Sequence, residues 1–393
     1  FPWLGANVYN KSDGTAPSYL KPYRILSVGG KKIAVVGIAG GHTPTSTLPA
    51  LVKHLEFRNE ASEAAYWTRE VKRLHTPDAV IILAHIGFGG DIMMKADIST
   101  MTYAPGQTGY GTLSIARAAK GANVVIGGHN HVGLLKGYQD PESGVLIAES
   151  YWGLSDVSRI SLNFDDATGR YMGARAELIP LWTALTGEDP EVKQTIKNFS
   201  ASVNKAMDVV IGESYVDLGP GETPDTPIGN WVADAIRRQA GTDLAFQNTA
   251  GIRAFMKKGQ IRMRDLYQIM PFENTLVKLQ LTGAQVRKLI EDNLRGRGSK
   301  MQISGLRVGY RLSANGAPTV VSLERNGKSV SPSAVFTVAT NNYLAGGGSG
   351  GKVLKEGRAV TDTMLPLRDL LIKEVRASSP LTMPEGGRFV RLD

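Results

Sequence analysis

Two short apolar runs in the first part of the chain have the pattern of buried strands. Residues 31–39 (KKIAVVGIA) and 79–84 (VIILA preceded by alanine) are rich in β-branched residues and are bounded by glycine, proline or polar residues. Between them, residues 59–74 have the composition of a helix. A further helix, ended by Gly121, leads to a third strand in NVVIGGHNH. This alternation of strands and helices predicts an α/β layered architecture.

From about residue 144 onward the spacing of the apolar residues changes. The stretch GVLIAESYWGLSDVSRISLNFD, followed by LIP, predicts antiparallel strands that close a first domain. Asp189 and Pro190 are then typical of a helix start, with proline at the first helical position. The apolar residues that follow have helical spacing: Val192, Ile196, Phe199, Val203 and Met207. We interpret this helix as a rigid linker between two domains.

The clearest helix of the remaining chain is TGAQVRKLIEDNLR, in which Thr282 and Gln285 can form a capping box. Its apolar residues share one face: Val286, Leu289, Ile290 and Leu294. We therefore expect a first domain over residues 1–183, a linker helix within 184–212 and a second domain over 213–393.

Composition and charge narrow the class of protein. With 393 residues the chain can form two or three domains, each with its own core. We find no apolar run near the roughly 18–20 residues that a membrane span needs, so we predict no span. The absence of cysteine excludes disulfides and thiolate metal sites. The formal charge of +9 is scattered, which is typical of a solvated basic surface or of a field that attracts anions to a cleft. We recognise no nucleic-acid-binding module and expect no nucleic-acid polymer as a partner.

Two of the six histidines, His129 and His131, follow the apolar run NVVIGG. On an extended backbone, residues two apart project to the same side, so both imidazoles are expected to face one site. The preceding glycines allow a sharp turn and a close approach of the backbone. Imidazole is the commonest neutral metal ligand. Alone, however, such a pair is equally typical of a polar loop.

His85 favours the metal interpretation, because it also ends an apolar strand. The ends of neighbouring strands in an α/β sheet converge on one crevice. We therefore expect His85, His129 and His131 to form one metal site. The other histidines lie in loop or helix contexts and are assigned structural or surface roles: His42, His54 and His75.

Several motifs occur in an order that resembles a known family: FPWLGANVY, KKIAVVGIAG, AHIG, VVIGGHNHV, NTAGIRA, MPFENTLVKLQLTGAQV and ATNNYLAGGGSG. Together they closely resemble the 5′-nucleotidase / UDP-sugar hydrolase family of metallophosphoesterases. The resemblance extends over nearly the whole chain. It implies a periplasmic or extracellular location and a role in nucleotide catabolism.

The resemblance also implies a fold and a cofactor. Residues 1–183 would belong to a calcineurin-like metallophosphoesterase domain, an α/β four-layer sandwich, and the linker helix would lead to an α+β substrate-binding domain. Such enzymes hold two divalent ions (Zn, Mn or Co) about 3.5–4 Å apart, which clamp the phosphoryl group and activate the attacking water. By this resemblance His85 and His129 are ligands of one metal, and His131 is a ligand of the other.

In the family, the remaining metal ligands and a transition-state histidine precede the position that matches FPWLGANVY. We therefore expect the catalytic His and Asp residues upstream of Phe1, and an incomplete metal site in this chain alone. The upstream segment is then a partner that the activity requires.

In the second domain the resemblance assigns substrate contacts. Asn248 and Arg253 of NTAGIRA match positions that hold the base and the phosphate, and a guanidinium offers phosphate a rigid fork of donors. Phe272 and Tyr343 match two aromatic residues that stack on the nucleobase. Without the resemblance, Arg253 is also typical of a surface ion pair, and each aromatic residue of a core.

Asn274 matches a further base-contacting position, and Gly298 more loosely matches a backbone contact. Three departures bear on specificity. Ser349 replaces an aspartate that grips both ribose hydroxyls, residues 219–231 lack the family's phosphate-binding arginines, and Glu273 stands where glycine is usual. A neutral hydroxyl is a weaker partner than a carboxylate, so we expect poor discrimination between ribo- and deoxyribonucleotides.

The leading interpretation is a di-metal phosphomonoesterase that hydrolyses nucleotides. The alternatives in the same superfamily are a cyclic-nucleotide phosphodiesterase, a UDP-sugar hydrolase or a hydrolase of another anionic ester. From a different class, the chain can be a non-catalytic nucleotide-binding fragment. Metal-binding motifs upstream of Phe1 would favour the enzyme over the fragment.

Overall fold

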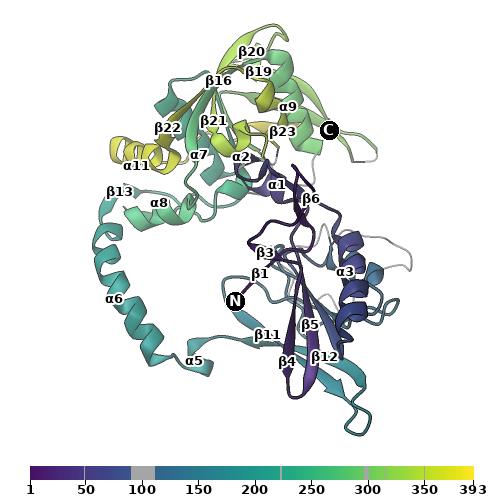
Figure 1. Ribbon diagram of the computed structural model, residues 1–393. Coiled ribbons are helices and arrows are strands. Elements are labelled where there is room, and N and C mark those ends of the chain that lie inside the picture. Colours follow the sequence, from purple (N-terminus) through teal and green to yellow (C-terminus); the bar gives the residue numbers. More distant parts are fainter. Residues whose placement is uncertain (48, 90–110, 222–223, 296–300, 315, 349) are drawn as a thin grey trace. The chain divides into compact units, whose positions relative to one another are not determined.

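The computed structural model describes all residues except 48, 90–110, 222–223, 296–300, 315 and 349. The chain forms two compact units (Figure 1). Unit 1 comprises Phe1–Pro44 and Val52–Asp189, and unit 2 comprises Thr45–Leu51 and Pro190–Asp393. The division between Asp189 and Pro190 falls inside the segment predicted as a linker, and the three-part organisation stays a prediction.

The centre of unit 1 is a six-stranded sheet with the order β4-β5-β7-β8-β10-β9. Its four central strands are parallel, and the two edge strands are antiparallel to their neighbours. The strands are β4 (Tyr23–Val28), β5 (Lys31–Ile38), β7 (Ala79–Ala84), β8 (Val124–Ile126), β9 (Tyr138–Gln139) and β10 (Leu146–Ala148). The strands expected at 31–39 and 79–84 are confirmed. β10 corrects the expectation of antiparallel strands after residue 144, because it pairs in parallel with β8.

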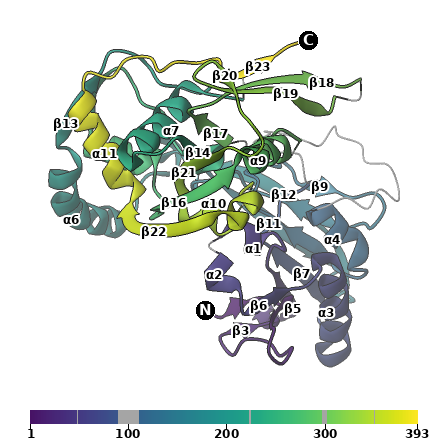
Figure 2. The ribbon, with the colours of Figure 1, turned by 90° about the horizontal axis from the view of Figure 1, so that it is seen from above.

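Helices cover one face of this sheet. The main helix, α3 (Glu60–His75), begins where the Asn59 side chain accepts the amide hydrogen of Ser62, and it packs against β5 and α4 (Thr112–Ala118) (Figure 2). Three short helices are not part of this layer: α5 (Thr183–Thr186) in unit 1, and α1 (Thr43–Ser46) and α2 (Pro49–Val52), which lie largely in the Thr45–Leu51 segment of unit 2.

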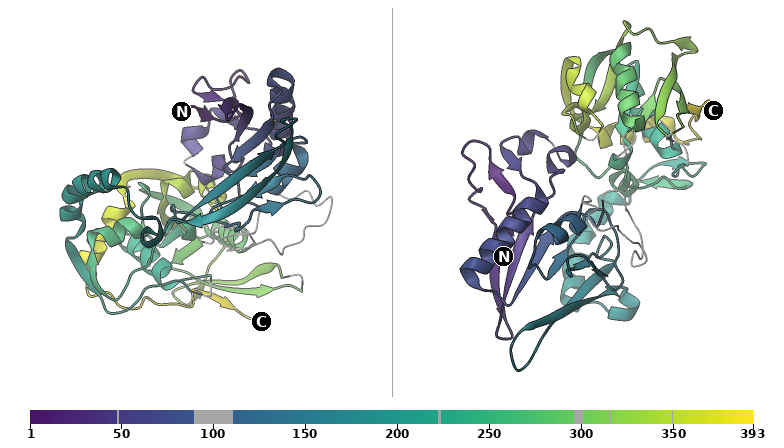
Figure 3. Two further views of the ribbon diagram at one scale, coloured as in Figure 1. Left: turned by 90° about the horizontal axis from the view of Figure 1, so that it is seen from below. Right: turned by 90° about the vertical axis from the view of Figure 1, so that its right-hand side faces the viewer.

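A long hairpin covers the other face. It consists of β11 (Asp156–Phe164) and β12 (Tyr171–Pro180), paired antiparallel as the sequence predicted (Figure 3). Ile160, Leu162 and Ala174 of this hairpin pack against the core around Val124 and Leu146. Two small two-stranded sheets complete the unit: β1 (Trp3–Leu4) with β3 (Leu20–Lys21), and β2 (Val8–Asn10) with β6 (Leu55–Phe57). This is a layered α/β unit, and a full four-layer sandwich stays a prediction.

Unit 2 is built on a mixed five-stranded sheet with the order β17-β14-β21-β16-β22. Its strands are β14 (Leu244–Asn248), β16 (Thr275–Thr282), β17 (Met301–Ser304), β21 (Val335–Asn341) and β22 (Arg358–Pro366). A four-stranded sheet lies beside it, with β18 (Arg307–Leu312), β19 (Pro318–Arg325), β20 (Lys328–Ser329) and β23 (Phe389–Arg391). A separate pair joins β13 (Val210–Ser214) and β15 (Gly259–Arg262).

Both faces of the five-stranded sheet are covered by helices. Alternate strand residues supply two cores, so that Ala245 belongs to one and Leu244 and Phe246 to the other. The first core receives α7 (Pro227–Ala240), α8 (Met263–Ile269) and α11 (Leu367–Ser378), and the second receives α9 (Gly283–Arg295) (Figure 2). The short helices are α10 (Asn342–Ala345), η1 (Thr249–Gly251) and η2 (Lys352–Glu356).

Local sequence signals explain two helix starts in unit 2. The predicted capping box of α9 is confirmed: Gln285 N–H donates to Thr282 Oγ1 at 3.2 Å, and Thr282 N–H donates to Gln285 Oε1 at 2.9 Å. The helix α6 (Pro190–Met207) begins at the predicted proline. Its apolar stripe is nevertheless exposed, with Phe199 74% accessible. Its role as a linker stays a prediction. None of the described helices combines the length and the apolar character that crossing a bilayer requires.

Candidate functional site

The carboxyl ends of β7 and β8 lie side by side in unit 1 and carry two of the predicted ligands. His85 follows Ala84 directly, and His129 follows β8 after Gly127 and Gly128. Backbone hydrogen bonds join the two loops, since Gly128 N–H donates to Ile86 O at 3.0 Å. Parallel pairing of the strands is therefore what brings these histidines to the same edge of the sheet.

Glycines allow the two loops to approach closely. A Cβ on Gly87 would lie 2.0 Å from Asn130 Cγ, and a Cβ on Gly127 would lie 2.9 Å from Ile86 O. Side chains at these positions would push the loops apart. Close packing of the two loops therefore requires glycine at position 87 (in AHIG) and at position 127 (in IGGH).

The rings of His85 and His129 have centres 5.1 Å apart and an interplanar angle of 71°. Two imidazoles on one tetrahedral ion, with metal–nitrogen bonds of about 2.0–2.1 Å, have ring centres roughly 5 Å apart. The separation of this pair therefore suits two ligands of one metal. Within the described ranges, however, no group of three or more His, Asp or Glu side chains is arranged to hold an ion.

His131 lies two residues further along the same loop. Its ring stacks on Trp152, with centres 5.5 Å apart and planes 15° from parallel. Both His129 and His131 have positive φ angles, 82° and 59°, which are sparsely populated by residues other than glycine. The expected extended backbone is therefore wrong, because both histidines have left-handed φ angles. That the two imidazoles face one site stays a prediction.

His42, which the sequence analysis assigned to a structural or surface role, joins the histidine pair. Its ring centre lies 4.0 Å from that of His129, with planes 31° apart. The sequence contains a signal that was missed. The segment IAGGH follows β5 as IGGH follows β8, and β5 is a parallel neighbour of β7 in the same sheet. The strand-end rule that selected His85 therefore selects His42 as well.

Two of these imidazoles, those of His42 and His129, have lowered pKa values that favour the neutral form. Partial burial, and then the nearby His42, His85 and His131, lower the pKa of His129 to about 4. Burial and the neighbouring His85 also lower the pKa of His42. A neutral imidazole keeps a nitrogen lone pair for a metal, so His42 and His129 are each able to bind a cation at neutral pH.

A buried carboxyl lies beneath the glycine pair. Glu149 follows the last residue of β10 and is 1% exposed. Burial raises its pKa to about 8, although the backbone amides of Phe88 and Val132 act in the opposite direction. A Cβ on Gly127 would lie 3.3 Å from Glu149 Oε2. No local pattern marks this residue, because a glutamate in a run such as LIAES carries no sign of burial.

In unit 2, four of the predicted substrate residues come to one edge of the five-stranded sheet. Asn248 ends β14, and Tyr343 lies in α10, directly after β21, which is parallel to β14. The antiparallel strand β16 begins next to them, with Leu276 opposite Asn341, so that the preceding Asn274 and Phe272 reach the same edge. The Asn274 side-chain amide donates to Asn342 Oδ1 at 2.8 Å.

The two aromatic residues differ in exposure. Phe272 is 47% exposed, so it is not the core residue that the alternative interpretation required. Tyr343 is half-buried, and a Cβ on Gly348 would lie 2.5 Å from its ring, so that glycine at this position leaves room for it.

Arg253 is exposed, and its Nη1 donates to Ala250 O at 3.3 Å. In the described part of the chain its guanidinium forms no ion pair with a carboxylate. The alternative interpretation, in which Arg253 belongs to a surface ion pair, is therefore not supported there. Its remaining donors are therefore available to an anion. Gly298 and Ser349 lie outside the described residues.

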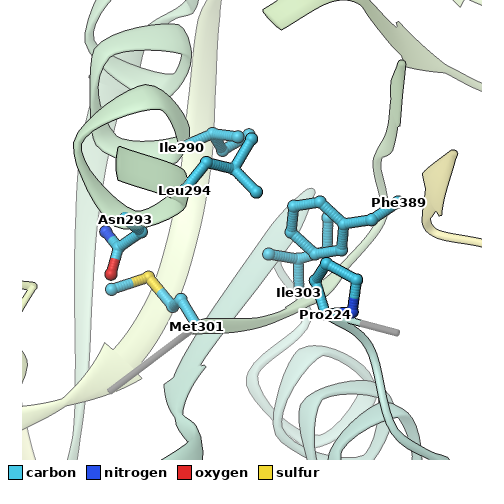
Figure 4. A pocket seen from close by; sticks show the side chains of 7 residues that line it. All are labelled: Pro224, Ile290, Asn293, Leu294, Met301, Ile303 and Phe389. Atoms are coloured by element: carbon cyan, nitrogen blue, oxygen red, sulfur yellow. The ribbon is translucent and has the colours of Figure 1, made fainter. Parts of the chain in front are cut away.

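Hollows elsewhere in unit 2 are less suited to a substrate. A cavity of about 10 Å³ lies between α9, β17 and β23 and is lined mainly by apolar side chains (Figure 4). Even one water needs roughly this volume, so it holds no ligand. A polar hollow of about 460 Å³ contains Asp234 and Arg388, but these two charges already pair at 2.7 Å.

Comparisons with known proteins find several 5′-nucleotidases among the proteins that resemble this chain. Residues 204–356 match the family model described as "5′-nucleotidase, C-terminal domain". A snake venom 5′-nucleotidase of Naja atra is 27% identical over 90% of this chain and 71% of its own length. Endonuclease YhcR of Bacillus subtilis is also 27% identical, over 88% of this chain, but the chain spans only 27% of the length of that relative.

The fold comparison covers the whole chain. The crystal structure of a 5′-nucleotidase precursor from Thermus thermophilus matches with a TM-score of 0.82 and 24% identity. The match includes 100% of this chain and 79% of the other. This likeness establishes the shared fold of the two proteins.

Proposed function

We propose, on the premise that this chain belongs to the 5′-nucleotidase family, that it acts in a metal-dependent phosphoesterase that hydrolyses nucleotides. The observation that carries the proposal is the meeting of Asn248, Phe272, Asn274 and Tyr343 at one sheet edge inside the segment that matches the family model. These residues are far apart in sequence, and the ends of β14, β16 and β21 bring two aromatic rings and two amides to one edge of the sheet.

Unit 2 supplies the substrate site in this proposal. Phe272 and Tyr343 bind the two faces of a nucleobase, and base–aromatic stacking contributes about 1–3 kcal/mol per ring. Asn248 and Asn274 form hydrogen bonds to the base. Arg253 binds the phosphate, because its exposed guanidinium is not already held by a carboxylate in the described residues.

Unit 1 supplies the site of hydrolysis. His85 and His129 would hold a divalent ion such as Zn, Mn or Co, and His131 is assigned to a second ion by family resemblance. The described residues supply two suitably spaced imidazoles and not a complete ligand set. Bound divalent ions would polarise the phosphate oxygens and lower the pKa of the attacking water. The proposal includes a periplasmic or extracellular location, since one relative is a venom protein.

Calorimetric titration of this chain with AMP, in the presence of a chelator to prevent turnover, tests the substrate site. We expect Phe272→Ala to weaken AMP binding at least ten-fold, because a stacking surface is lost. Phe255→Ala is a matched control, since Phe255 is 50% exposed and Phe272 is 47% exposed. UDP-glucose and a cyclic nucleotide serve as competing ligands. The proposed site would be contradicted if AMP does not bind the chain. It would also be contradicted if neither Phe272→Ala nor Phe255→Ala changes the affinity for AMP.

A further inference from the structure

Three neighbouring amide side chains are buried at the carboxyl ends of β14 and β21. Gln247 is 1% exposed, Asn341 is 0% exposed and Asn248 is 8% exposed. Only Asn248 has a role in the proposed function. A buried amide is stable only if its donors and acceptors are paired, so the arrangement of these three groups constrains which atoms of Asn248 face a ligand.

A backbone donor determines how the amides are oriented. Leu344 N–H donates to Asn341 Oδ1 at 2.7 Å, as the cap of α10. A backbone N–H can only donate, so the oxygen of Asn341 must lie on this side and its nitrogen on the other. Asn341 Nδ2 then donates to Gln247 Oε1 at 3.0 Å and to Asn248 Oδ1 at 2.9 Å.

The side-chain oxygen of Asn248 is therefore fully used within the protein. It accepts a second hydrogen bond from Gln247 Nε2 at 3.2 Å, which fills both of its acceptor positions. Among the hydrogen bonds of the described residues, none is donated by Asn248 Nδ2. Glycine is needed at position 251 beside these amides, since a Cβ there would lie 2.6 Å from Gln247 Nε2 and 3.1 Å from both Oδ1 and Nδ2 of Asn248. Asn248 is thus left with only an N–H group to offer a ligand.

We propose that Asn341, together with Gln247, is a positioning residue that fixes Asn248 as a hydrogen-bond donor, so that the site selects bases with a ring-nitrogen acceptor opposite Asn248. The inference rests on the proposed function and specifies the chemistry of that site. A base without an acceptor at this point leaves the Asn248 donor unpaired, and a site built to pair a polar group rejects ligands that lack the partner.

Affinities of AMP and of its 1-deaza, 3-deaza and 7-deaza analogues test this directly. Each analogue replaces one ring-nitrogen acceptor by C–H and keeps the stacking surface and the phosphate. With the chelator present, we expect one analogue to bind the wild-type chain about ten-fold more weakly than AMP, and the other two to bind like AMP.

Asn341→Asp should remove that selectivity. Its carboxylate still accepts the Leu344 amide hydrogen but has no donor, so Gln247 and Asn248 must rotate and donate to it. Asn248 Oδ1 then faces the ligand, and the deaza analogue should bind as well as AMP. Asn248→Asp places an acceptor at the same point without changing Asn341, and the same loss of selectivity is expected. Asn326→Asp, an equal change at an exposed turn, is the control and should keep the ten-fold penalty.

The possible results separate the two proposals. If AMP does not bind the wild-type chain, the proposed function fails and this inference fails with it. If AMP binds in a Phe272-dependent way but no deaza analogue is penalised, the inference alone is wrong. A penalty that persists in folded Asn341→Asp or Asn248→Asp also overturns it. A purely structural role of Asn341 would weaken all four ligands equally and leave their ratios unchanged.

Discussion

The buried Glu149 should make the stability of unit 1 depend on pH. Its pKa is raised by burial from an ordinary value of 4.5 to about 8. A carboxyl with a raised folded-state pKa favours the folded state fully only below its unfolded pKa, and this contribution is lost as the pH rises towards the folded pKa. Stability should therefore fall between about pH 4.5 and pH 8.

The structure sets the size of the effect. Each unit between the two pKa values corresponds to about 1.4 kcal/mol, so ionising Glu149 by pH 8 costs up to about 5 kcal/mol. Relaxation of nearby dipoles around the ionised carboxylate reduces this cost, and we expect about 2–4 kcal/mol. Glu149→Gln keeps the shape but cannot ionise. It should match the wild type near pH 4.5 and exceed its stability by that amount at pH 8.

Urea unfolding followed by far-ultraviolet circular dichroism at pH 4.5, 6, 7 and 8 measures the difference. If the units unfold separately, only one transition should shift, and the other serves as an internal reference. Asp166→Asn, at an exposed turn of the same unit, controls for the loss of one negative charge. A difference that does not change with pH, or a variant less stable than the wild type at pH 8, would refute the assignment of a strained buried carboxyl.

Two further predictions concern the histidine cluster. His129→Ala should weaken zinc binding to the chain at least ten-fold, as measured by calorimetry. His54→Ala, at an exposed position, is the control and should leave zinc affinity unchanged. Equal effects of the two substitutions would show that zinc binds elsewhere. Gly87→Ala places a methyl group 2.0 Å from the Asn130 side chain. It should lower the free energy of unfolding by about 1–3 kcal/mol and also weaken zinc binding. Gly219→Ala, whose added methyl group has no atom within 4 Å, is the control and should change neither the free energy of unfolding nor zinc binding.

Features that depend on neighbours in sequence were predictable. The strand at 79–84, the helix after Asn59 and the capping box at Thr282 all follow from residue spacing and from side chains that reach a backbone group a few residues away. The meeting of His85 and His129 was also predictable, because it needs only parallel strands and the convergence of their ends.

Where the chain leaves a regular element, local pattern no longer suffices. His129 and His131 were expected on an extended backbone but have positive φ angles, since their loop is shaped by contacts with the loop after His85. The parallel pairing of β10 with β8 was not expected either. Both depend on segments at least 22 residues away, about which a short window of sequence carries no information.

Burial and hydrogen-bond polarity were decided by the tertiary structure alone. The same glutamate would have an ordinary pKa on the surface, and Glu149 becomes unusual only because β10 ends inside the core. The direction of the Asn248 amide depends on Asn341, 93 residues further along the chain, whose own orientation is imposed by the cap of α10. A residue's type determines which hydrogen bonds it is able to form. Only the fold places the partner groups, and so determines which of these hydrogen bonds are formed.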